Sequence, residues 1–235
     1  MMFFDLNIKG NSYEKNIQLA EHAYNYGWNH INFSYSQFDI DDALNFKNDL
    51  IDEFKDKISI DYTLYIKPKN SSDVFKTTKK FRDKVNCISI EGGDLKVNRA
   101  AVENIKVDIL SKPYFKRFDS GLNHILAKEA CDNNVAIELS FKDILSSYLS
   151  YRAKIIANFK DIYTLYNKFQ FPLIISSGAS NIFDIKSPID LESFFKSTGF
   201  FDFNKSMQHC KNILEFNNNR SDLIYKGVRR VNPEA

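Results

Sequence analysis

Hydrophobic and polar positions alternate along the chain in two patterns. Short apolar runs predict strands, and longer segments with an apolar position every three or four residues predict helices. Strands are expected at residues 3–8, 28–34, 58–67, 87–91, 107–110, 135–140 and 171–176. Helices are expected at residues 12–26, 41–54, 71–82, 96–103, 119–133, 150–169, 188–196 and 204–216. This alternation is typical of repeated βα units and therefore of a mainly parallel sheet.

Turn-forming residues support these boundaries. Gly27 follows the first helix, Pro68 ends the third strand, and the pair Gly92-Gly93 closes the fourth. Since seven strands alternate with helices and no Pro/Gly-rich linker interrupts them, we expect an α/β fold, a TIM-barrel-like (β/α) barrel with mainly parallel strands. An open doubly wound sheet is the alternative.

The regular pattern ends near residue 216, which predicts one barrel domain over residues 1–216. Residues 217–235 are expected to form a basic C-terminal tail that carries Lys226, Arg229 and Arg230. This tail has little periodicity, so it is either mobile or returns as a final edge segment.

The composition is that of an ordinary soluble protein. The chain has 235 residues, 43% hydrophobic and 26% charged, with a mean hydropathy of −0.38. No apolar run approaches the roughly 20 residues that span a bilayer, and no secretory signal is recognisable, so a cytoplasmic protein without membrane contact is expected. Cys87, Cys131 and Cys210 are too widely spaced for a disulfide framework and are expected to be buried free thiols.

A net charge of +2 does not by itself indicate a nucleic-acid-binding protein, so any surface that binds nucleic acid must be a local basic patch. Basic residues gather where elements begin and end, at Lys112, Lys116, Arg117, Arg152, Lys154 and Lys186. Cations in loops can reach phosphates without disturbing a core. Solvated loop charge, balanced by nearby carboxylates, is the alternative interpretation. Tyr114 and Phe115 add aromatic surface for base stacking or partner contact.

In a barrel, catalytic residues are expected at the carboxyl ends of the strands. Four acidic residues are candidates for a metal-dependent phosphoesterase site, namely Asp5, Glu91, Asp108 and Glu138. The chain has only four histidines and no His-x-His pair in its first strand, so metal ligands are scarce. GxSxG, GxxxxGK[ST] and GxGxxG motifs are absent. We therefore expect no catalytic residue and no bound metal or other cofactor in this chain.

Two small-residue turns have the composition of phosphate-binding loops. Ser176-Ser177-Gly178-Ala179 follows a predicted strand, and Gly92-Gly93 follows another. Small residues let backbone amides approach an anion. Each is more simply interpreted as an ordinary strand-to-helix turn.

An ordered series of residues resembles the ribonuclease P protein component 3 family. Its central part is Val107-Asp108-Ile109-Leu110-Ser111-Lys112-Pro113, then Arg117, then Asp119-Ser120-Gly121-Leu122-Asn123-His124-Ile125-Leu126-Ala127-Lys128 and Asn134-Val135-Ala136-Ile137-Glu138-Leu139. Shorter matches follow the same order along the chain, at residues 4–8, Arg152, Asn158, residues 174–179, 187–191 and 227–229. Within the central part, Asp119 or Ser120 is expected to cap the helix that follows.

The resemblance implies an archaeal-type barrel subunit of the ribonucleoprotein that removes 5′ leaders from precursor tRNA. In that family the RNA is the catalyst and uses Mg²⁺. The implied partners are the ribonuclease P RNA, protein component 2, other protein subunits and precursor tRNA. The rival interpretations are the barrel phosphoesterase and a structural interaction domain that has no RNA contact.

This chain departs from the family pattern at two positions of the central loop. Lys112 stands where the family usually has His, and Phe118 stands where a second Arg follows Arg117. The cationic role of the loop is therefore expected to be reduced or moved to Lys112 and Lys116. Residues 38–84 carry the least specific similarity.

Overall fold

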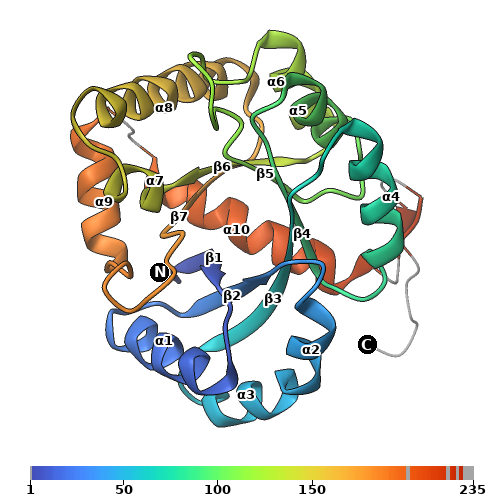
Figure 1. Ribbon diagram of the computed structural model, residues 1–235, viewed down its shortest axis with the longest axis vertical. Helices are drawn as coiled ribbons and strands as arrows, with labels where there is room; N and C mark the ends of the chain where they lie inside the picture. Colours follow the sequence, from blue (N-terminus) through green and yellow to red (C-terminus); the bar gives the residue numbers. More distant parts are fainter. Residues whose placement is uncertain (1, 200–201, 221–222, 226–227, 230–235) are drawn as a thin grey trace.

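The structure, a computed structural model, describes residues 2–199, 202–220, 223–225 and 228–229. Seven strands form one sheet in sequence order with every neighbouring pair parallel. Their bounds are β1 Phe4–Lys9, β2 His30–Tyr35, β3 Ser59–Ile66, β4 Cys87–Glu91, β5 Ile109–Ser111, β6 Ala136–Ser140 and β7 Leu173–Ser176. The sheet curls into a nearly closed barrel, which confirms the predicted fold class (Figure 1).

Helices surround the barrel and connect the strands (Figure 1). Their bounds are α1 Tyr13–Asn25, α2 Ile40–Asn45, α3 Lys47–Phe54, α4 Ser71–Phe81, α5 Leu95–Val102, α6 His124–Asp132, α7 Phe141–Leu145, α8 Leu149–Phe169, α9 Pro188–Ser197 and α10 Phe203–Asn218. The strands are buried on both faces, because helices cover the outside and side chains fill the inside. Several interior positions are polar, among them Asp5, Asn32, Thr63 and Glu138.

Helix α10 completes the barrel where β7 and β1 fail to form a ladder. Toward the carboxyl ends of these strands the Lys9 N–H donates to the Ala179 carbonyl at 2.7 Å. Toward their amino ends α10 supplies the acceptors instead. Ser206 Oγ accepts from the Ile175 N–H at 2.9 Å, and His209 Nδ1 accepts from the Leu173 N–H at 3.1 Å. The helix therefore satisfies backbone donors that an open edge would leave exposed.

From β7, α10 runs across the barrel toward the start of β4 and β5 (Figure 1). Near its end, Asn218 Oδ1 accepts from the Asn86 side chain at 3.3 Å, just before β4. Arg220 forms an ion pair with Asp108, just before β5. Helix α10 and Arg220 thus cover the amino-terminal side of the barrel at β7, β4 and β5.

Three expectations about the helices need correction. The helix expected at residues 41–54 is two helices, α2 and α3, which meet at Phe46. The helix expected from residue 119 begins at His124, and its cap is Asn123 rather than Asp119 or Ser120, since the Asn123 side chain accepts from the Ile125 and Leu126 N–H groups. Helix α7 directly follows β6 and was not expected.

Beyond the barrel, strands β8 Leu223–Tyr225 and β9 Val228–Arg229 pair antiparallel as a separate small sheet. The tail cations Lys226 and Arg230 lie outside the described residues, and the domain division at residue 216 stays a prediction. Cys87 and Cys210 are buried free thiols as expected, whereas Cys131 is only partly buried. None of the described helices is long and apolar enough to cross a membrane.

Candidate nucleic-acid interface

The loop between β5 and α6 contains three of the predicted cations, and α7 holds its first turn in place. Lys112 and Lys116 adopt left-handed backbone conformations, with φ of 51° and 56°. Asp143 on α7 binds the Lys112 ammonium at 2.7 Å and accepts from the Tyr114 hydroxyl at 2.8 Å. Burial lowers the pKa of Lys112 and the Asp143 carboxylate raises it, with a net rise. Lys112 therefore stays charged but is committed to a protein partner.

Asn98, a fully buried residue of α5, fixes the rest of this loop. Its Nδ2 donates to the carbonyls of Pro113 at 2.9 Å and Gly121 at 2.8 Å, and its Oδ1 accepts from the Gly93 N–H at 2.9 Å. Gly121 has φ of +69°, and a Cβ there would lie 1.9 Å from the Pro113 carbonyl oxygen. The side-chain amide of Asn98 thus joins three backbone positions and fixes the loop residues that lie between Pro113 and Gly121. Sequence reasoning missed Asn98, whose only signal is a polar residue on an otherwise apolar helix face.

The structure brings together Lys116, Arg117, Phe118 and Lys154, which we call the loop cluster. Phe118 is 95% exposed, and the Lys154 ammonium lies 3.7 Å from the centre of its ring. Arg117 is held by Asp119 through two bonds of 2.6 and 2.9 Å and by the Gly93 carbonyl at 3.2 Å. The Arg117 hydrogen bond lowers the pKa of Asp119. Lys116 is exposed and packs over Phe115. Cationic and aromatic groups therefore share one surface.

The remaining two predicted cations make separate contacts. Arg152 Nε donates to the carbonyls of Ile144 at 3.1 Å and Ser147 at 2.8 Å, so it ties α8 to the end of α7. Lys186 Nζ donates to the Phe183 carbonyl at 3.0 Å in the segment before α9. In the described part of the chain, no hydrogen bond or ion pair links either residue to the loop cluster.

In each of the two small-residue turns, two backbone donors are already used within the protein, which agrees with ordinary strand-to-helix turns. The Ser177 N–H donates to Asp5 and the Ala179 N–H to the Ser177 hydroxyl. In the other turn, the Gly92 N–H donates to the Ser111 carbonyl at 2.7 Å and the Gly93 N–H to Asn98. Neither turn offers a set of free amides to an anion.

Asp5 and Glu138 lie inside the barrel rather than at its rim, and both are fully buried. Asn7 Nδ2 donates to Glu138 at 2.7 Å. The Asp5 carboxylate accepts from the Asn7 and Ser177 N–H groups, each at 3.2 Å. Burial raises the pKa of Asp5 to about 6. Glu91 is the one acidic candidate that ends a strand, where it accepts from the Tyr65 hydroxyl at 3.0 Å.

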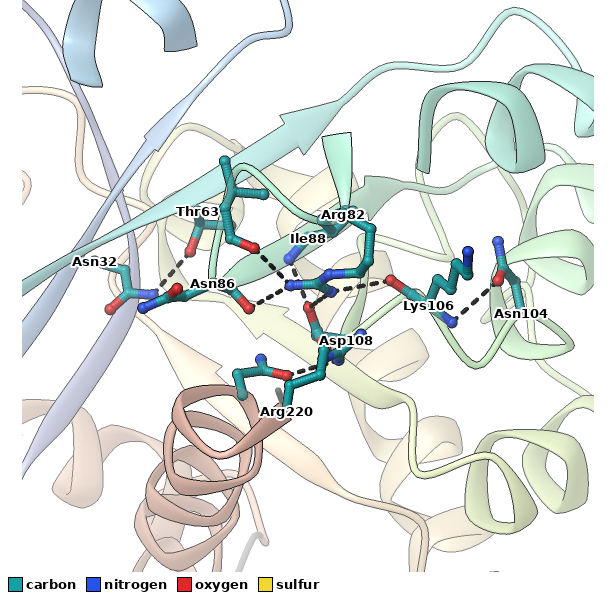
Figure 2. A network of polar contacts seen from close by, with 11 residues as sticks. Asn32, Thr63, Arg82, Asn86, Ile88, Asn104, Lys106, Asp108 and Arg220 are labelled. Carbon is teal, nitrogen blue, oxygen red and sulfur yellow. Dashed lines mark hydrogen bonds and ion pairs between the residues drawn. The ribbon is translucent and has the colours of Figure 1, made fainter. Parts of the chain in front are cut away.

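Asp108 was expected at a carboxyl end of the barrel, and this expectation is wrong. It precedes β5 and lies at the opposite end, between Arg82 at 2.5 Å and Arg220 at 2.8 Å (Figure 2). It also accepts from the Ile88 N–H at 2.7 Å. Figure 2 shows both guanidinium groups pointing at this carboxylate. Asp108 is an architectural residue, so it does not belong to a site at the open end.

The histidines do not form a metal centre. His30 is the first residue of β2, within the strand expected at residues 28–34, and His209 Nδ1 accepts from the Leu173 N–H of β7; burial lowers the pKa of both histidines. Within the ranges that the structure describes, no group of three or more His, Cys, Asp or Glu side chains could hold a metal ion.

The raised pKa of Asp5 predicts a pH-dependent stability. The group titrates near its ordinary pKa of 3.8 when unfolded and at about 6 when folded, so its stabilising contribution is complete below pH 3.8 and is lost as the pH rises through 6. Between pH 4.5 and 7.5 we expect the wild type to lose about 2 kcal/mol more unfolding free energy than Asp5→Asn. Urea unfolding across this range measures the difference, and parallel pH profiles of the two proteins would contradict it.

Comparisons with known proteins give consistent similarities. The profile described as RNase P subunit p30 matches residues 2–222. Ribonuclease P protein component 3 of Methanothermobacter thermautotrophicus is 37% identical over 243 aligned positions, which cover 100% of this chain and 97% of that protein. A chain in a cryo-EM structure of archaeal ribonuclease P with mature tRNA is 33% identical, with a TM-score of 0.81 and 99% of each chain covered.

A more distant similarity concerns the barrel only. The crystal structure of histidinol phosphate phosphatase from Lactococcus lactis, complexed with zinc, L-histidinol and phosphate, is 12% identical, with a TM-score of 0.57. It covers 85% of this chain and 94% of that one. At this identity the similarity shows a shared fold and carries no inference about chemistry.

Proposed function

Since this chain belongs to the RNase P subunit p30 family, we propose that it acts as the component 3 protein of a ribonuclease P ribonucleoprotein. In this role it supports the catalytic RNA during endonucleolytic removal of the 5′ leader from precursor tRNA. The chain contributes to an enzyme as a subunit and performs no bond cleavage itself.

One observation carries this proposal, namely a similarity that extends over the entire chain. The relative in archaeal ribonuclease P and this chain cover 99% of one another at 33% identity. The barrel phosphoesterase is not favoured, because its acidic candidates are divided between two ends of the barrel and its interior. The described residues also lack a cluster of metal ligands of the kind that hydrolysis by a metal-activated water requires.

We propose that the loop cluster is the principal RNA contact. Each phosphate that a cation neutralises releases counterions, and an exposed aromatic ring can stack on an unpaired base. The ammonium of Lys154 over the Phe118 ring supplies positive charge at the position where the family usually has a second arginine. The loss of that arginine in this chain is thereby offset by a residue from α8.

Lys112, Arg152 and Lys186 are proposed as secondary RNA contacts. Each already donates to a protein partner, so a phosphate must compete with or share that bond. Their contribution to RNA affinity should therefore be smaller than that of Lys116, which is exposed and forms no hydrogen bond or ion pair with another described residue.

The partners follow from the family in the same way. We propose that the chain binds the ribonuclease P RNA, pairs with protein component 2, joins other protein subunits and acts on precursor tRNA within a cytoplasmic assembly. Mg²⁺ is proposed to be used by the RNA. Co-purification with component 2 tests the pairing, and the magnesium requirement of the assembly tests the role of the ion.

The variant Lys116→Ala/Arg117→Ala is expected to weaken RNA binding while the fold stays intact. Two lost phosphate contacts reduce the slope of log K against log salt by about 1.4–1.8. Filter binding at several salt concentrations measures the slope, and circular dichroism monitors the fold.

The matched control is Lys76→Ala/Lys79→Ala, which removes two exposed cations from α4. An equal loss of RNA binding in both double variants would show that only overall charge matters. An unchanged salt dependence of binding in Lys116→Ala/Arg117→Ala would show that these two residues do not contact the RNA. Binding of component 2 without any RNA binding by the wild type would support the structural interaction domain instead.

A further inference from the structure

A cavity of about 760 Å³ opens at the carboxyl ends of the barrel strands. Five strands contribute to its lining, through residues such as Lys9 from β1, Tyr65 from β3 and Ser140 from β6, and the segments after β5 and β7 contribute Lys112 and Gly178. The entire segment between β2 and α2, residues 36–39, also lines it. We call this space the mouth cavity. In barrel proteins this position is where small ligands bind.

Polar groups of the mouth cavity are left without partners. Ser34 and Ser140 both line it, and the hydroxyl of each is buried and forms no hydrogen bond with any other described residue. A buried hydroxyl without a partner costs free energy that a ligand can recover. Gly178, also in the lining, keeps the space beside Ser140 open, because a Cβ there would lie 2.3 Å from the Ser140 hydroxyl.

The charges of the lining do not suit a bare anion. Three ammonium groups, from Lys9, Lys67 and Lys112, are matched by three carboxylates, from Asp39, Asp42 and Glu91. The lining is therefore neutral in sum but contains both signs. A ligand that has a negative group together with hydrogen-bond donors fits this mixture better than inorganic phosphate does.

The lining also provides amide and aromatic side chains. Asn7, Asn11 and Gln37 can each donate and accept, as the edge of a nucleobase requires. Phe38 is 81% exposed at the rim, although an apolar ring of this size is ordinarily covered. An exposed ring beside amides and lysines is a combination that binds an unpaired nucleotide through stacking, edge recognition and phosphate contact.

We propose that the mouth cavity binds a single nucleotide unit, with its base against Phe38 and the amides and its phosphate near Lys9 and Lys67. This inference rests on the proposed function in one respect, since that function offers unpaired nucleotides of an RNA as a source. A free mononucleotide is the other source of the same chemistry. Both have a base and a phosphate, so the experiment has an arm for each.

The first arm titrates the full chain with AMP, GMP, CMP and UMP by isothermal titration calorimetry. Saturable binding of at least one is expected, and Phe38→Ala should weaken it about tenfold, the usual effect of losing one stacking ring. Phe183→Ala is the matched control, because Phe183 is also 81% exposed but does not line the cavity. Equal binding by the wild type and Phe38→Ala would overturn the proposed site.

The second arm assembles the chain with ribonuclease P RNA that contains photoreactive nucleotides. Crosslinks to residues 36–38 that disappear in Phe38→Ala identify the RNA as the source, whereas mononucleotide binding without crosslinks identifies free nucleotide. If neither arm shows binding at Phe38, the inference is wrong even when the chain stimulates cleavage. If the cavity binds nucleotide but the chain does not stimulate cleavage, the proposed function fails and the site stands.

Discussion

Replacing Asp108 with alanine is expected to lower the free energy of unfolding by about 3–5 kcal/mol, because the change leaves a buried guanidinium without its counter-charge. Arg82 and Asp108 each have only 5% of their side chains exposed, and the carboxylate also binds Arg220 (Figure 2). The Ile88 N–H loses its acceptor as well. Urea unfolding of the wild type and variant, with the slope compared, measures the effect.

An exposed pair of the same chemistry serves as the control. Asp119 binds Arg117 through two bonds, yet 65% of its side chain is exposed. Asp119→Ala should therefore cost at most about 1 kcal/mol, since water screens the pair. A similar urea midpoint for Asp108→Ala and the wild type would show that α10 and β5 do not depend on this ion pair.

Replacing Asn98 with leucine is expected to have the second large effect. Leucine has nearly the same size but cannot bond the two carbonyls and the N–H that Asn98 now satisfies. Each buried backbone group without a partner costs about 1–3 kcal/mol, so the loss of all three partners is expected to cost at least about 3 kcal/mol. Because those groups hold the loop that contains Arg117, RNA affinity should fall together with stability.

Asn123→Ala provides the comparison for Asn98→Leu. Asn123 caps α6 directly after the same loop, and the loss of a cap costs about 1 kcal/mol without releasing the loop. Urea unfolding and filter binding are measured on both variants. If Asn98→Leu weakened RNA binding no more than Asn123→Ala, the amide would not be what positions the loop cluster.

The seven strands could be predicted because each is a short apolar run buried on both faces. Residues 87–91 agree with β4, and the others differ from prediction by one or two residues at an end. The start of α6 was misplaced, since Asp119 and Ser120 have the composition of caps while Asp119 in fact binds Arg117. A local pattern cannot reveal that a capping residue is engaged elsewhere.

The contacts that define the ends of the barrel could not be predicted, because they join distant segments. Asp108 binds Arg82, 26 positions earlier, and Arg220, 112 positions later. On α10, Ser206 and His209 appear as ordinary helix residues, and only the structure shows them accepting from the open edge of β7. The candidate cations were found by sequence, but the association of Lys154 with Phe118 required the fold.

Reconstituted cleavage tests directly whether this chain supports the catalytic RNA. Ribonuclease P RNA and protein component 2 are assembled with and without this chain, and removal of the 5′ leader from precursor tRNA is measured over a range of magnesium concentrations. If the chain supports the catalytic RNA, adding it raises the cleavage rate at modest magnesium and lowers the magnesium requirement. Cleavage with the same rate and the same magnesium requirement in both assemblies would contradict this role.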